Sequence, residues 1–132
     1  LESVFKELIL LKVDLESIIL KPNMILPGLE SSENISNEVI AKMTFNVLKN
    51  NVPKIVPGIA FLSGGQSSDL AAKRLSILNQ LYLEERPWKL TFSYGRALQQ
   101  DALSNWANKS NESTQDALIY RAKMNYLASL GN

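Results

Sequence analysis

Three short apolar segments in this chain each run into a polar or glycine-rich turn and then into a segment with helical spacing. The apolar segments span 15–20, 58–62 and 88–92. Strands that alternate with helices in this way indicate parallel strands joined by crossover helices. The sequence therefore predicts an α/β fold with three strand–helix units, preceded by the end of a further helix.

Apolar residues at helical spacing predict helices over 1–12, from Ser36 onward, about 68–81, about 96–106 and 112–130. Ser36 is the expected N-cap of the second helix. Residues 24–34 contain Pro27-Gly28 and several serines, which predicts a loop. The residues expected on the buried stripes of the first three helices are Val4, Phe5, Leu8 and Leu11; Val39, Ile40, Met43, Val47 and Leu48; and Leu70, Leu75 and Leu78.

The spacing of the strand ends leaves two architectures open. Lys21, Ser63 and Arg96 lie 42 and 33 residues apart, and an eight-fold barrel allots about 31 residues to each strand–helix unit. An open doubly wound sheet fits the spacing equally well. Both architectures place their active sites at the carboxyl ends of the strands. In a barrel, we expect Ile59, Phe61 and Phe92 to point into the interior.

Composition excludes several classes of function. The chain has no cysteine and no histidine, which rules out disulfides, a serine–histidine triad and sites built on thiolate or imidazole ligands. Basic and acidic residues nearly balance at a net charge of +1, without the basic stripe that nucleic-acid binding requires. No apolar run approaches the roughly 20 residues of a membrane span. We expect a globular domain with no nucleic-acid partner, no membrane partner and no metal. Leu1 stands within an expected helix, so we also expect a piece of a longer polypeptide.

Lys21 is the candidate nucleophile. It ends the first apolar segment, and Pro22 follows it immediately. A lysine at this place can attack a carbonyl to form an imine if burial or a neighbouring cation keeps the amine neutral. The alternative is an ordinary solvated lysine, as most lysines are.

Two turns are candidates for binding an anion. Ser63-Gly64-Gly65-Gln66-Ser67 brings paired glycines to a helix start, where backbone N–H groups bind phosphate. Its alternative is a plain turn with an N-cap at Ser67 or Ser68.

The second turn, Ser93-Tyr94-Gly95-Arg96, carries an arginine that can make forked contacts to phosphate. The alternative is an arginine paired to a surface carboxylate. That alternative is weakened because a cation in the first helical turn opposes the helix dipole, a conflict that an anionic ligand removes.

Taken in order, the motifs Leu20-Lys21-Pro22-Asn23-Met24, 61–67 (FLSGGQS) and 92–99 (FSYGRALQ) closely resemble class I fructose-bisphosphate aldolase. The resemblance extends over essentially the whole chain and covers the C-terminal part of that enzyme. It implies that residues 1–132 form the C-terminal part of a single barrel domain, with the last three strand–helix units of an incomplete (β/α)8 TIM barrel.

The resemblance also implies roles for single residues. Lys21 matches the Schiff-base lysine, which binds the ketone carbon of fructose 1,6-bisphosphate or dihydroxyacetone phosphate. A second set matches the residues that hold a substrate phosphate: Ser63, Gly64, Gly65, Ser93, Gly95 and Arg96. The implied reaction is reversible cleavage of the hexose bisphosphate into two triose phosphates, without metal or other cofactor, by a cytoplasmic homo-tetramer.

The family's acid–base glutamate, aspartate and accessory lysines belong to earlier strands, and this sequence contains none of them. We therefore expect activity only together with the N-terminal part of the barrel. The alternative is a non-catalytic truncated remnant that acts as a phosphate-binding or interaction module. Ser17-Ile18 and Leu26 depart from the family's usual residues, so packing beside Lys21 is expected to differ slightly.

Overall fold

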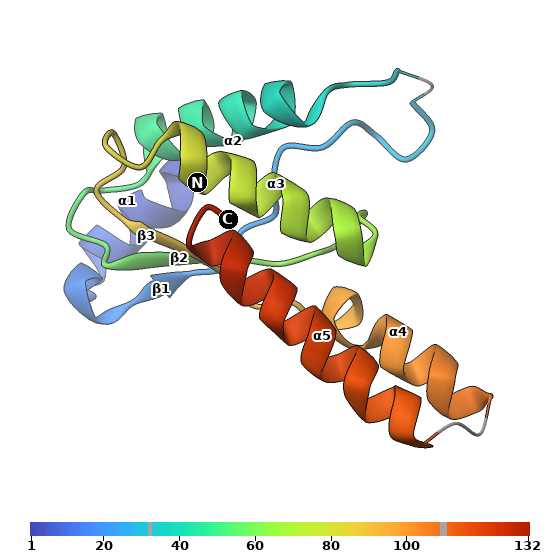
Figure 1. The fold of residues 1–132 in the computed structure, drawn as a ribbon. Coiled ribbons are helices and arrows are strands. Elements are labelled where there is room, and N and C mark those ends of the chain that lie inside the picture. Colours follow the sequence, from blue (N-terminus) through green and yellow to red (C-terminus); the bar gives the residue numbers. More distant parts are fainter. Residues whose placement is uncertain (32, 109–110) are drawn as a thin grey trace.

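Three parallel strands form the sheet of this chain in the order β1-β2-β3 (Figure 1). The computed structural model describes residues 1–31, 33–108 and 111–132. The strands are β1 (Ile19–Leu20), β2 (Gly58–Phe61) and β3 (Lys89–Phe92). Neighbouring strands are thus successive in sequence, each pair joined by a crossover helix. The predicted parallel α/β fold is confirmed.

Five α-helices accompany the sheet in the described part of the chain. They are α1 (Glu2–Leu10), α2 (Asn37–Asn51), α3 (Ser68–Leu81), α4 (Arg96–Ala107) and α5 (Asn111–Ser129). The predicted N-cap at Ser36 is confirmed, because its side chain accepts a hydrogen bond from the Val39 N–H. Ser67 caps α3 in the same way through the Leu70 N–H. None of the described helices is both long enough and apolar enough to cross a bilayer.

The two faces of the sheet differ in burial. Ile59 and Phe61 are fully buried and Leu90 is nearly so, on the face that α2 and α3 cover (Figure 1). Side chains alternate along a strand, and on the opposite face Ile19 is 65% exposed. The expectation that Ile59, Phe61 and Phe92 point into a barrel interior was therefore wrong. These side chains pack under the helices, and the opposite face is the open one.

The first predicted strand is shorter than expected. Residues Leu15–Ser17 form a 3-10 turn, and only Ile19–Leu20 pair with β2. The Asp14 carboxylate accepts a hydrogen bond from the Glu16 N–H at 3.0 Å, and the Asp14 backbone carbonyl accepts one from the Ser17 hydroxyl at 2.8 Å. These local bonds offer the backbone an alternative to sheet pairing, which apolar content alone does not reveal.

Of the residues expected on the buried faces of the first three helices, some are buried and others are exposed. Phe5, Ile40, Leu48, Leu75 and Leu78 are buried as predicted. A second group is at least about one-third exposed: Val4, Leu11, Val39, Met43 and Leu70. In α2, the positions turned toward the core belong instead to Ala41, Thr44 and Phe45.

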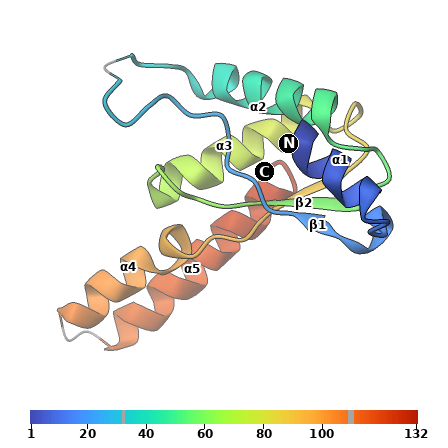
Figure 2. The ribbon, with the colours of Figure 1, turned by 180° about the vertical axis from the view of Figure 1, so that it is seen from behind.

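The helices α4 and α5 form an antiparallel pair that projects away from the sheet (Figures 1 and 2). The C-terminal half of α5 returns to α3 and β3, where Ala128 joins the core. Arg121 of α5 is buried beside acidic residues of α3 and α4. This placement brings the starts of α3 and α4 to the same edge of the sheet.

Candidate functional site

The turn after β2 is a closed glycine turn that leads directly into α3. Gly65 adopts φ +76°, a left-handed conformation that side chains other than glycine rarely take. The Gln66 N–H donates to the Ser63 carbonyl at 3.2 Å, which closes the turn. Ser63 is buried and Gly65 is exposed. The α3 helix starts directly beyond Ser67, so its N-terminal dipole is directed at the turn.

The segment after β1 is fastened to this turn. Asn23 Nδ2 donates to the Gly64 carbonyl at 3.2 Å, and its Oδ1 accepts the Met24 N–H at 2.9 Å. The Leu62 N–H donates to the Pro22 carbonyl at 3.0 Å, which continues the pairing of the two strands beyond β1. Asn23 therefore holds the chain that follows Lys21 in contact with the glycine turn.

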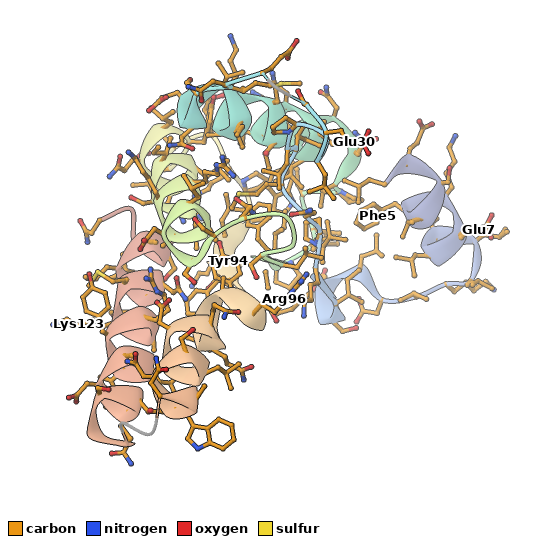
Figure 3. The ribbon with its side chains drawn as sticks, turned by 90° about the vertical axis from the view of Figure 1, so that its right-hand side faces the viewer. Phe5, Glu7, Glu30, Tyr94, Arg96 and Lys123 are labelled. Atoms are coloured by element: carbon orange, nitrogen blue, oxygen red, sulfur yellow. The ribbon has the colours of Figure 1, made fainter. Side chains whose placement is uncertain are left out.

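The turn after β3 is anchored through Tyr94. Its hydroxyl donates to the Ala71 carbonyl of α3 at 2.9 Å. Burial raises the pKa of Tyr94 above its usual range, so the hydroxyl remains a donor. Tyr94 and Arg96 lie on either side of Gly95 at the start of α4 (Figure 3). The Ser93 N–H donates to the Phe61 carbonyl at 2.8 Å, which holds this turn beside the end of β2.

A cavity of about 540 Å³ joins the two candidate turns. Ser63 and Gly65 line it from the turn after β2, and Arg96 lines it from the first turn of α4. Gly64 lines a neighbouring cavity of about 330 Å³, which Gly65 and the loop at 23–29 also border. The glycine turn and the arginine therefore lie at the same edge of the sheet, as predicted. Ser93, Gly95 and Lys21 are not among the residues that line either cavity.

Along the strand direction, Lys21 lies nearer the middle of the sheet than the two turns, which follow the ends of β2 and β3. The strand register pairs Leu20 with Ile59 and Ala60 with Thr91, which places Lys21 level with Ala60 and Thr91. By alternation it belongs to the open face with Ile19. Ser63 is three residues beyond Ala60, so at about 3.3 Å per residue the turn stands about 10 Å above the Lys21 backbone. The Lys21 side chain is exposed.

Sequence reasoning missed three charged residues beside this site. Asp69 and Asp101 line the 540 Å³ cavity, and both are bound by Arg121. The acid in the first turn of α3 was visible in the sequence. Its partner was not, because Arg121 lies 52 residues away. Within the described residues, no three carboxylates lie close enough together to hold a metal ion.

Comparison with known proteins identifies relatives along the whole chain. The family model described as fructose-bisphosphate aldolase class-I matches residues 1–132. Fructose-bisphosphate aldolase B of Sparus aurata is 47% identical over 99% of this chain and 36% of its own length. Fructose-bisphosphate aldolase 4, cytosolic, of Arabidopsis thaliana is 49% identical over 90% of this chain and 30% of its own length.

Solved structures agree with the sequence matches. The Plasmodium falciparum fructose-bisphosphate aldolase, in a complex with TRAP and a small-molecule inhibitor, superimposes with a TM-score of 0.90 at 39% identity. The match covers 98% of this chain and 38% of that one. The chain thus spans about one third of the length of the relatives it matches.

Proposed function

Because this chain belongs to the class I fructose-bisphosphate aldolase family, we propose that it supplies the imine-forming lysine and a phosphate site for reversible cleavage of fructose 1,6-bisphosphate. The products are dihydroxyacetone phosphate and glyceraldehyde 3-phosphate. In this proposal, residues 1–132 are the C-terminal part of one barrel domain. Activity then requires the remaining strands, which carry the groups that transfer protons.

The observation that carries the proposal is one cavity, beyond the carboxyl ends of β2 and β3, that the two turns share. Ser63, Gly65 and Arg96 line it, and they combine an exposed glycine turn with a guanidinium that forks to phosphate. Lys21 lies about 10 Å lower on the adjacent strand. The Lys21 side chain belongs to the open face, so a phosphorylated ketone whose phosphate lies at the turn would extend along that face toward the amine.

In this proposal, Lys21 carries the covalent chemistry of the segment. Nζ of Lys21 attacks the ketone carbon, and loss of water leaves a protonated imine. A base from the remaining strands takes the proton of the hydroxyl on the departing carbon, which becomes the aldehyde, and the electron pair of the broken carbon–carbon bond moves into the imine to give an enamine. The aldehyde product leaves, a proton returns to the enamine carbon, and hydrolysis of the imine releases the ketone product and the free amine. Ser63, Gly65 and Arg96, which share the cavity, hold the phosphate during these steps, and Gly64, Ser93 and Gly95 belong to the turns that position them.

Two further assignments rest on the relatives. We propose a cytosolic location, as the name of the Arabidopsis relative states for that protein. A homo-tetramer is proposed on family resemblance, and size-exclusion chromatography with light scattering measures it directly.

The test is to trap the imine in the complete polypeptide that carries this segment. Incubation with dihydroxyacetone phosphate and then borohydride should add the substrate carbon skeleton to Lys21, mapped by peptide mass spectrometry. Lys21→Arg keeps the charge and should abolish both the adduct and the cleavage. An adduct on another lysine, with Lys21 unmodified, refutes the assignment. Phosphate binding without any adduct would instead favour the non-catalytic alternative.

A further inference from the structure

Arg121 has the most enclosed charged side chain near the candidate phosphate site. Only 7% of that side chain is exposed. Its Nη1 donates to Asp69 Oδ1 at 2.7 Å, and its Nε and Nη2 donate to Asp101 Oδ2 at 3.1 and 2.9 Å. Burial works to lower the pKa of Arg121, but the hydrogen bonds to both aspartates outweigh it and raise that pKa. The guanidinium is therefore a permanent charge that joins α3, α4 and α5.

Both aspartates face the same cavity as Arg96. The charged residues that line this cavity are Asp69, Arg96 and Asp101. The Asp69 side chain is 86% exposed and that of Asp101 is 42% exposed, so neither carboxylate is withdrawn from a ligand in the cavity. Two carboxylates and one guanidinium make a poor site for a phosphate dianion unless a further cation offsets them. Arg121 is that cation.

Arg96 has no ion pair within the described part of the chain. The two carboxylates that line the same cavity, Asp69 and Asp101, are already bound by Arg121. We propose that Arg121 is a positioning residue for substrate binding. Its ion pairs with Asp69 and Asp101 prevent both carboxylates from pairing with Arg96, so that the Arg96 guanidinium is free to bind phosphate. This inference rests on the phosphate site proposed above and names a residue outside it.

The test uses the complete enzyme, with inorganic phosphate as a competitive probe and fructose 1,6-bisphosphate as substrate. Arg121→Gln keeps part of the hydrogen bonding and removes the charge. We expect the inhibition constant for phosphate and the KM for the bisphosphate to rise about three- to tenfold, as one nearby partly screened charge would cause. The kcat should change less than about twofold, because Arg121 does not touch the reacting atoms.

Charge rescue separates this role from a purely structural one. Adding Asp69→Asn and Asp101→Asn to Arg121→Gln removes the carboxylates that would capture Arg96. Phosphate binding should then return to within about twofold of the wild type. A clamp that only holds three helices together cannot be restored by deleting its other partners. An unrescued triple variant, or an Arg121→Gln enzyme with unchanged phosphate binding, overturns the proposal.

If Arg121→Gln does not fold, phosphate binding by the Asp69→Asn, Asp101→Asn double variant tests the proposal instead. Because Arg96 is already free in the wild type, the double variant should bind phosphate at least as tightly as the wild type; weaker binding overturns the proposal. A wild-type enzyme that neither cleaves the bisphosphate nor binds phosphate would contradict the proposed function itself, which is a different outcome.

Discussion

Gly65→Ala tests whether the left-handed turn after β2 is needed for phosphate binding. Gly65 has φ +76°, and a Cβ added there would meet Leu26 Cδ1 at 3.4 Å. That distance is an ordinary van der Waals contact, so the change adds little steric cost. The backbone conformation is then the main penalty of the substitution.

The size of the penalty follows from two opposing effects. A non-glycine residue in the left-handed region costs about 1–2 kcal/mol. Alanine recovers about 0.4–1 kcal/mol by restricting the unfolded chain. The net destabilisation of the native turn should therefore be about 0.5–1.5 kcal/mol. The equilibrium between the native turn and its altered conformations then shifts about two- to twelvefold, since about 1.4 kcal/mol is tenfold.

Thermal unfolding and steady-state kinetics of the complete enzyme measure both consequences. We expect a lower Tm, by roughly 1–6 °C, and a KM for the bisphosphate raised by up to the same two- to twelvefold. Gly28→Ala is the matched control, because Gly28 has no atom within 4 Å of an added Cβ and no left-handed φ. If Gly65→Ala is as stable as Gly28→Ala and binds substrate normally, the assigned role of the left-handed turn is wrong.

Three further predictions follow from the site and the sheet. Arg96→Ala should raise the KM for the bisphosphate at least tenfold, since charged hydrogen bonds contribute about 1.5–3 kcal/mol each; an equal loss for an unphosphorylated analogue counts against a phosphate role. Tyr94→Phe should destabilise the enzyme by about 1 kcal/mol at pH 7. Because burial raises the pKa of Tyr94, the advantage of tyrosine should shrink as pH rises above about 10, and a pH-independent difference in denaturant titrations would refute this. Residues 1–132 expressed alone should show neither a cooperative thermal transition nor aldol cleavage, because β1 and β3 each leave one edge unpaired; a cooperative transition with turnover would contradict this.

The strand–turn–helix order and the residues of the two turns could be predicted from the sequence. Local chemistry determines them: glycines permit the turn at Gly65, and the Ser36 and Ser67 hydroxyls accept the first helical N–H groups. The three motifs around Lys21, Gly65 and Arg96 are equally local, and together they were enough to indicate the family.

Tertiary structure alone decided which residues face one another. The sequence placed Ile59 and Phe61 in a strand, but their face depends on the side that α2 and α3 cover. Likewise, Arg121 meets Asp69 and Asp101 only because α5 folds back across α3 and α4. Hydrophobic periodicity indicates which secondary structure a segment forms and which of its faces is apolar. Contacts between distant residues depend instead on how separate helices and strands pack.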